Sequence, residues 1–290
     1  MTRVAVVQTG SILFDTCATL EKGERLIAEA AREGAQFALF PEAFLGGYPK
    51  GEDFGARVGS RTPEGRDRFA RYFASAIEVP GPATERLAEA ARSHRIWIGM
   101  GVIERDRGTL YCTVLFFSPD GVLAGKHRKV MPTAMERLIW GFGDGSTLPV
   151  VETPAGRAGA VICWENYMPL LRAAMYGKGV QLYCAPTVDD RDSWIPTMRH
   201  IALEGRCFVL SACQFVEGLI RGGSMIVDPL GNVLAGPEYG RETILTAGID
   251  LAEIARGKFD LDVAGHYARP DLFRLEVDET PQHPITFHHD

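Results

Sequence analysis

Residues 159–169, with the sequence GAVICWENYMP, constrain the fold most, because an apolar run passes there directly into a segment that a proline starts as a helix. Residues 160–162 are small or β-branched and are typical of the end of a buried strand. Pro169 suits the first turn of a helix. Such a strand-to-helix unit predicts an open α/β sheet, which places ligand sites outside the carboxyl ends of its strands. Cys163, at the junction, is therefore a candidate nucleophile.

A free cysteine is more often a small buried hydrophobic residue than a nucleophile. The context of Cys163 favours the catalytic role, since Trp164, Glu165 and Asn166 directly after it are an unusual end for a core strand. A helix start or a turn amide close by also favours the thiolate over the thiol. Cys184 lies near another expected strand end, but the Ala-Pro that follows it offers neither a helix start nor a charged neighbour.

A thiol nucleophile needs a base, and charged residues follow two other expected strands. The apolar run 36–41 delivers Glu42 at its carboxyl end, where a proline prevents further ladder hydrogen bonds. Residues 121–129 predict a strand of period two, which places Lys129 on the same face as His127. The apolar residues after Lys129 draw the chain back toward the core. Taken singly, a glutamate such as Glu42 is more often a solvated loop residue.

A second glutamate, Glu136, follows Lys129 by seven residues in a short helical stretch over 133–140, where a glutamate is usually exposed. Together, Glu42, Lys129 and Cys163 resemble the nitrilase superfamily of carbon–nitrogen hydrolases, whose mark is a Glu, Lys and Cys triad in that chain order, each at a strand end. The matching motifs are FPEAF, HRKVMPT and CWENYMP. The second glutamate that the family keeps near its lysine corresponds to Glu136, and the resemblance extends over 4–273.

The residues after the cysteine separate branches of this superfamily. Trp164-Glu165 resembles the nitrilase branch proper, whereas amidase-type members tend to carry tyrosine and aspartate. Members that act on cyanide usually have Trp-Glu-His, so Asn166 favours organic nitriles, and the resemblance extends to bacterial aromatic and arylacetonitrile-type nitrilases. Two alternatives stay open: an amidase or carbamoylase with the same triad, and a non-catalytic nitrilase-like binding protein, against which the intact triad argues.

The residue types themselves predict the chemistry. A Cys163 thiolate, formed by proton loss to Glu42, attacks the nitrile carbon to give a thioimidate. The Lys129 ammonium and the Trp164 backbone N–H stabilise the charge that develops on the nitrile nitrogen. Water activated by Glu42 then releases ammonia, and the resulting thioester is hydrolysed to a carboxylic acid. Glu136 is expected to hold Lys129 or the water, since a buried cation needs a charged partner.

Substrate contacts are expected from the aromatic residues nearest to the candidate site in sequence, Tyr48 and Trp164. The loop 186–194 follows an expected strand at the same edge of the sheet. We expect this loop to line the pocket mouth with Thr187 and Trp194. An aromatic residue is more often part of the core than of a pocket, so these assignments compete with plain packing.

Strands alternate with helices along the chain. The patterns predict strands over 2–8, 95–102, 180–186 and 207–215, and helices over 16–33, 84–94 and 193–206. Residues 113–125 and 224–236 are similar to each other, and each predicts a β-hairpin around a turn that contains proline and glycine. This pair favours two αβ halves packed as a sandwich. The family resemblance implies the same α/β fold: a two-sheet αββα sandwich with an internal pseudo-twofold, pairing through helical faces into an αββα–αββα dimer.

No linker, low-complexity run or change of composition divides the chain, so one carbon–nitrogen hydrolase domain over 1–290 is expected, with a C-terminal tail from about 275 to 290. The formal charge of −6 is spread along the chain and gives no basic stripe for nucleic acid. No apolar run approaches the ~18 residues of a membrane span. We therefore expect no nucleic-acid or membrane partner, and the partners expected are a small-molecule nitrile and further copies of the chain in a homodimer or higher homo-oligomer.

The six cysteines lack paired spacing and are typical of free thiols in a reducing compartment. The first residues pass directly into an expected strand and show no signal-peptide pattern. A cytoplasmic protein is therefore expected. No closely spaced set of Cys and His residues predicts a metal site, and no cofactor is expected.

Overall fold

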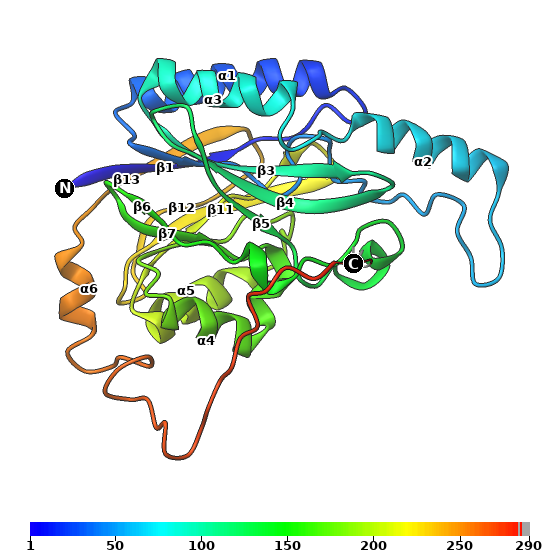
Figure 1. The fold of residues 1–290 in the computed structure, drawn as a ribbon. Helices are drawn as coiled ribbons and strands as arrows, with labels where there is room; N and C mark the ends of the chain where they lie inside the picture. Colours follow the sequence, from blue (N-terminus) through cyan, green and yellow to red (C-terminus); the bar gives the residue numbers. More distant parts are fainter. Residues whose placement is uncertain (284, 286–290) are drawn as a thin grey trace, which may run out of the picture.

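The computed structural model describes residues 1–283 and 285, and it contains two mixed sheets that face each other (Figure 1). The first sheet has the order β13-β1-β2-β3-β4-β5, with β1 Thr2–Gln8, β2 Phe37–Leu39, β3 Trp97–Asp106, β4 Thr109–Phe117, β5 Leu123–Arg128 and β13 Thr243–Ile249. The second has the order β10-β11-β9-β8-β7-β6, with β12 also paired to β11. Its strands are β6 Val151–Thr153, β7 Gly156–Ala160, β8 Leu182–Cys184, β9 Phe208–Ser211, β10 Phe215–Val216, β11 Ile220–Val227 and β12 Val233–Tyr239.

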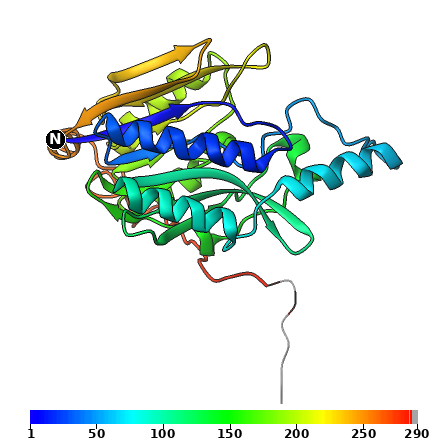
Figure 2. The ribbon, with the colours of Figure 1, turned by 90° about the horizontal axis from the view of Figure 1, so that it is seen from above.

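Helices cover the outer faces of both sheets. The α-helices are α1 Thr16–Arg32, α2 Pro63–Ser75, α3 Pro82–His94, α4 Pro169–Gly177, α5 Trp194–Gly205 and α6 Ala252–Gly257, and three short 3₁₀ helices are η1 Ala134–Leu138, η2 Gly145–Thr147 and η3 Cys163–Tyr167. Helices α1 and α3 lie side by side over the first sheet, α4 and α5 lie on the far side of the second, and α2 extends beyond the sheets (Figures 1 and 2). The expected helix over 16–33 begins where Asp15 accepts a hydrogen bond from the Ala18 N–H.

Three layers of apolar side chains separate these four layers of backbone. Because successive side chains of a strand point to opposite faces, Val4 and Val6 of β1 pack toward the second sheet, whereas Ala5 and Val7 pack toward α1 and α3. A third cluster joins the second sheet to α4 and α5 and includes Met175. The αββα sandwich inferred from the sequence is confirmed.

The internal similarity is a similarity of topology. Strands β1, β2 and β3 are parallel and are followed by antiparallel β4 and β5, and β7, β8 and β9 are parallel and are followed by antiparallel β11 and β12. The two expected hairpins are β4–β5 and β11–β12. Their turns are closed by the same pair of backbone hydrogen bonds, and Gly121 and Gly231 occupy equivalent left-handed positions with φ of 76° and 79°. The pseudo-twofold is thus present in both strand order and turn geometry.

One segment differs from the expectation. The strand expected over 207–215 is divided, because the Cys213 N–H donates to the Ser224 hydroxyl (2.8 Å) instead of continuing a ladder. The start of the expected tail packs along the molecule: Glu279 pairs with Lys178, and the Gln282 N–H donates to Asp144 (2.8 Å). Residue 284 and residues 286–290 of that tail lie outside the described residues. In the described part of the chain, no helix combines the length and the apolar character that crossing a membrane requires.

Candidate active site

The strand ends that the sequence singled out meet at one place between the two sheets. Glu42 follows β2, Lys129 follows β5 and Cys163 follows β7. Glu42 and Lys129 are fully buried, and Cys163 is 4% exposed. The three residues therefore lie in a space from which bulk water is largely excluded, where charges interact strongly.

Cys163 occupies a sharp turn between β7 and η3. Its φ is +50°, a left-handed conformation that a residue other than glycine keeps only when its surroundings hold it. The Cys163 N–H donates to the carbonyl of Pro186 (2.9 Å), and the Asn166 side-chain amide donates to the carbonyls of Val161 (2.9 Å) and Cys163 (2.8 Å). The turn is thus fixed from both sides, and the Trp164 N–H makes no hydrogen bond within residues 1–283 and 285.

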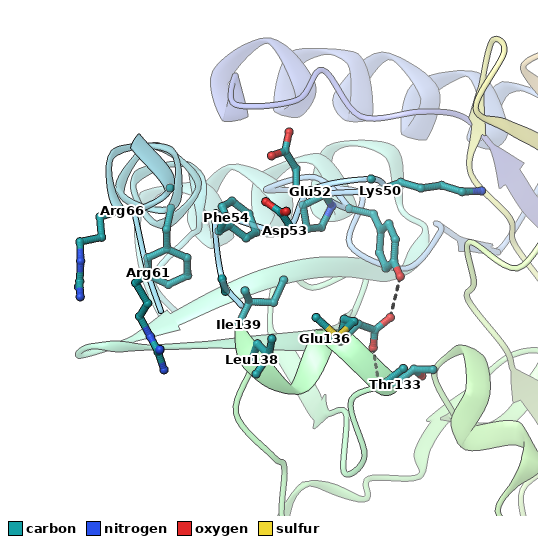
Figure 3. A pocket seen from close by; sticks show the side chains of 18 residues that line it. Lys50, Glu52, Asp53, Phe54, Arg61, Arg66, Thr133, Glu136, Leu138 and Ile139 are labelled. Atoms are coloured by element: carbon teal, nitrogen blue, oxygen red, sulfur yellow. Dashed lines mark hydrogen bonds between the residues drawn. The ribbon is translucent and has the colours of Figure 1, made fainter. Parts of the chain in front are cut away.

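The Lys129 ammonium joins the two glutamates. Its Nζ lies 2.7 Å from Glu42 Oε1 and 2.8 Å from Glu136 Oε2. A glutamate in a short helical stretch is usually exposed, but Glu136 is only 8% exposed. It also accepts hydrogen bonds from the Tyr48 hydroxyl (2.8 Å) and from the Thr133 N–H (2.6 Å), and Figure 3 shows Thr133 beside it. Glu136 therefore holds Lys129 in place and is itself held.

Three residues that the sequence did not single out complete the surroundings of Glu42. The Val188 N–H donates to Oε2 (3.2 Å), and the Gln214 side chain donates to the Glu42 backbone carbonyl (2.8 Å). The Cys112 thiol lies 3.7 Å from Glu42 Oε1. The backbone carbonyl of Cys112 accepts a hydrogen bond from the backbone N–H of Lys129 (2.8 Å). Gln214 carries the same signal as Glu42, a polar residue at the end of an apolar run, whereas Val188 and Cys112 give none.

The electrostatics of the cluster separate the roles of its members. Burial raises the pKa of Glu42 above its ordinary value, although the ammonium of Lys129 opposes this. Burial and the charge of Glu42 raise the pKa of the Cys163 thiol well above its ordinary value. Burial disfavours the charge on Lys129, but Glu42 and the other acidic groups around it together outweigh burial and keep the pKa of Lys129 well above its ordinary value. These shifts favour an ammonium on Lys129 and a thiol on Cys163, and the raised pKa of Glu42 makes its carboxylate a stronger base than an ordinary glutamate.

The expected substrate contacts fall into two groups. Thr187 is fully buried, and its hydroxyl donates to the Cys163 sulfur (3.2 Å), so it lies beside the candidate nucleophile and not at a pocket mouth. Trp164 is 41% exposed, and its indole N–H donates to Asp189 (2.8 Å) while the guanidinium of Arg191 lies over its ring. The indole therefore ties the turn after Cys163 to the loop 186–194.

Trp194 requires a correction. It is the first residue of α5 and was expected to line the pocket mouth, but it is 1% exposed and packs in the apolar cluster between the second sheet and α4 and α5. Its indole N–H donates to the buried Ser211 hydroxyl (2.9 Å), which satisfies the one polar atom of the ring inside the core. Cys184, the other candidate nucleophile, is likewise buried in the core between the two sheets.

A cavity of about 650 Å³ opens beside the cluster and reaches Glu136, Tyr48 and Thr133. Figure 3 shows Phe54, Leu138 and Ile139 on its walls and the charged side chains of the loop after Tyr48 around it. The lining residues come from the loop 48–61, from α2 and from η1. In the part of the chain that the structure describes, no group of three or more His, Cys, Asp or Glu side chains is arranged to hold a metal ion.

The fold and the site define the class of protein. Two solved structures have the same fold. The NitFhit protein of C. elegans matches with a TM-score of 0.78 and 24% identity, over 98% of this chain and 68% of that protein. Nit3 of Saccharomyces cerevisiae, a member of the nitrilase superfamily, matches with a TM-score of 0.73 and 22% identity, over 92% of this chain and 96% of that protein. These identities show the fold alone. Residues 3–259 match the carbon–nitrogen hydrolase family, and the chain belongs to that family.

Relatives of higher identity carry more specific names. The chain is 62% identical to an aliphatic nitrilase of Sinorhizobium fredii (strain HH103), over 98% of this chain and 97% of the relative. It is 56% identical to the bifunctional nitrilase/nitrile hydratase NIT4A of Lupinus angustifolius, over 98% and 88%. It is 55% identical to the nitrilase blr3397 of Bradyrhizobium diazoefficiens, over 98% and 94%. The resemblance to nitrilases seen in the three motifs thus extends over nearly the whole chain.

Proposed function

We propose that the protein hydrolyses an organic nitrile to a carboxylic acid and ammonia, with Cys163 as nucleophile. The observation that carries this proposal is the Lys129 ammonium, which lies within hydrogen-bond distance of Glu42 and Glu136 in a buried space beside the Cys163 thiol. Relatives named nitrilases, at 52% to 62% identity, support it. The amidase and carbamoylase alternatives, which would use the same triad, are not favoured by the names of these relatives. The intact cluster argues against a non-catalytic binding protein.

The contacts around the cluster support a proposed role for each residue. Glu42 accepts the thiol proton of Cys163, and its raised pKa favours it for this task over an ordinary glutamate. The thiolate attacks the nitrile carbon, and the negative charge that develops on nitrogen is stabilised by the Lys129 ammonium and by the Trp164 N–H. Water then adds to the thioimidate with Glu42 as base, ammonia leaves, and a second water hydrolyses the thioester to the acid and restores the thiol. Glu136 keeps Lys129 oriented throughout.

The cavity supports a substrate with an apolar body. Its walls carry aromatic and aliphatic side chains, and its volume of about 650 Å³ lies within the range of about 300–1,000 Å³ that small-molecule sites occupy. We propose Tyr48 as a substrate contact from the cavity side and Thr187 and Trp164 from the Cys163 side. We propose an aromatic or arylacetic nitrile as the substrate, as the sequence resemblance suggests. One relative is named an aliphatic nitrilase, so an aliphatic nitrile is the competing substrate class.

We also propose that the single domain over 1–290 works as a homodimer or a higher homo-oligomer. The outer face formed by η3, α4 and α5 supports pairing through helices, because these elements expose large apolar side chains, among them Tyr167, Leu170 and Leu203. Apolar residues gathered on one outer face favour contact with another protein surface. The molar mass measured in solution by light scattering would test this proposal.

The function is tested by ammonia release from matched pairs of nitriles and amides, spanning aliphatic, benzoic and arylacetic types, with wild type and Cys163→Ala. We expect turnover of nitriles over their amides that depends on Cys163, and the preferred type identifies the substrate class. Chromatography of the products measures how much amide accompanies the acid. Turnover of amides alone would move the protein to amidases, and the absence of any turnover would favour the binding protein.

A further inference from the structure

The carboxylate of Glu165 is fully buried beneath the Cys163 turn, and the proposed mechanism does not use it. It accepts three hydrogen bonds. Its Oε2 receives the Ile162 N–H (2.7 Å) and lies 2.9 Å from Nε2 of His127, and its Oε1 receives the Val130 N–H (2.6 Å). The hydrogen-bond partners of this carboxylate are therefore two backbone N–H groups and the imidazole ring of His127, all beside the candidate site.

The two backbone donors are neighbours of the proposed catalytic residues. Ile162 directly precedes Cys163, and Val130 directly follows Lys129. These residues belong to different sheets, since Lys129 follows β5 of the first sheet and Cys163 follows β7 of the second. One carboxylate thus joins the backbone that carries the nucleophile to the backbone that carries the ammonium.

His127 supplies the charge that a buried carboxylate needs. Its Nδ1 lies 2.8 Å from the carbonyl of Thr147 and its Nε2 faces Glu165, and both partners can only accept. Both ring nitrogens must then donate, so the ring is an imidazolium. Burial opposes this charge, but Glu165 and the Thr147 carbonyl together outweigh burial and raise the pKa of His127. Glu165 is therefore balanced by its own cation, and Lys129 remains available to Glu42 and Glu136.

We propose that Glu165 is a positioning residue, which sets the distance between the Cys163 sulfur and the Lys129 ammonium by holding the backbone beside each, with His127 as its counter-charge. The proposal rests on the proposed function, in which these two groups act on one nitrile. The left-handed φ of Cys163 makes the turn dependent on such support. A displacement of about 1 Å in a catalytic site can cost about a hundredfold in rate.

The variant Glu165→Gln tests this role because it keeps the size of the side chain and removes one acceptor. Its amide NH₂ must face either the Val130 N–H or the Ile162 N–H, and one of these bonds is lost. We expect kcat to fall by about 10- to 100-fold. KM should change by less than about threefold, because none of the residues that line the cavity contacts Glu165. His127→Gln keeps the carboxylate but removes its counter-charge, and a smaller loss of kcat, about tenfold, is expected.

Glu104→Gln is the matched control. Glu104 is 1% exposed and accepts hydrogen bonds from Lys126, Arg128 and Thr113, so it is also a buried carboxylate with charged partners on β5. It makes no contact with the backbone beside Cys163 or Lys129. Its substitution should lower the melting temperature as much as Glu165→Gln does and leave kcat within about twofold, because an interaction outside the site affects stability without displacing the reacting groups.

The experiment measures kcat, KM and melting temperature for wild type and the three variants, and the rate at which iodoacetamide alkylates Cys163, followed by peptide mass. A loss of kcat and a changed alkylation rate in Glu165→Gln and His127→Gln, but not in Glu104→Gln, would support the proposal. Equal losses in all three, or an unchanged kcat and alkylation rate in Glu165→Gln, would overturn it. If Glu165→Gln does not fold, His127→Gln decides in the same way. Alkylation needs no nitrile, so an enzyme that turns over no nitrile refutes the proposed function while the positioning role is still judged from the thiol.

Discussion

Replacing Lys129 by methionine should cost both stability and turnover. Methionine has nearly the length of the lysine side chain but no charge, so Glu42 and Glu136 would be left buried without the ammonium that lies 2.7 and 2.8 Å from them. Removal of one partner from a buried ion pair typically costs about 3–5 kcal/mol. Unfolding entropy is about 2.1 cal/mol/K per residue, or about 0.6 kcal/mol/K for a chain of this length, so the melting temperature should fall by about 5–8 °C. Loss of the donor to the developing negative charge should lower kcat by about a hundredfold to a thousandfold.

The sign of the pH dependence distinguishes this mechanism from a packing defect. The pKa of Glu42 is already raised in wild type, and Lys129 is the group that opposes the rise, so the pKa of Glu42 rises further in Lys129→Met. When the pKa of a carboxyl is higher in the folded state than in the unfolded state, the folded state loses stability as the pH rises from the unfolded-state pKa through the folded-state pKa. Below the unfolded-state pKa, this group causes no loss of stability. The deficit of the variant in melting temperature should therefore be larger at pH 8 than at pH 5.

Lys126→Met provides the comparison for this prediction. Lys126 lies three residues earlier on β5 and pairs with buried Glu104 (2.8 Å), but its side chain is 28% exposed and Arg128 still balances Glu104. Its replacement should cost about 1 kcal/mol or less, with kcat within about twofold. Differential scanning fluorimetry at pH 5 and pH 8 measures the melting temperatures and their pH dependence, and steady-state ammonia release measures kcat. A melting temperature of Lys129→Met within 2 °C of the control, roughly the size of 1 kcal/mol here, together with kcat within tenfold of wild type, would refute the reasoning.

Three further predictions follow from the contacts around the site. Tyr48→Phe removes the hydroxyl that donates to Glu136 (2.8 Å), and steady-state kinetics should show kcat/KM reduced by about 10- to 150-fold, as the loss of a hydrogen bond to a charged group costs about 1.5–3 kcal/mol; an unchanged value would contradict a role for this bond. Thr187→Val removes the donor to the Cys163 sulfur and should lower kcat by about tenfold in single-turnover measurements, whereas a change in KM alone would place Thr187 in substrate binding only. The acid limb of the pH profile of kcat/KM should lie above the ordinary glutamate value of 4.5, because Glu42 must be ionised to act as base and its pKa is raised; a limb at or below that value would exclude Glu42 as this group.

The sequence could predict local features of the site because they depend on local patterns. The period of two along 121–129 placed Lys129 and His127 on one face, and both are fully buried in the structure. The apolar run before Cys163 ends in a sharp turn, as the polar residues after it suggested. By contrast, Trp194 was assigned from its place in a loop near the site. In the structure it is the first residue of α5, and its side chain packs in the core between α5 and the second sheet. Position along the chain does not by itself give the direction of a side chain, because the helix that carries it decides which residues face the sheet.

The contacts between the two sheets could not be predicted from the sequence. The site depends on these contacts because its groups are divided between the two similar halves of the chain. The two halves share strand order, yet the proposed acid–base and cationic groups come from the first half, after β2 and β5, and the nucleophile comes from the second, after β7. Neither half alone holds the three groups. Gln214 reaches the Glu42 carbonyl across 172 residues, and Glu165 reaches the backbone beside Lys129 across 35. Because such contacts form only when the sheets are face to face, the proposed chemistry requires the packed sandwich, and a variant that loosens the contact between the sheets should lose turnover before it loses secondary structure.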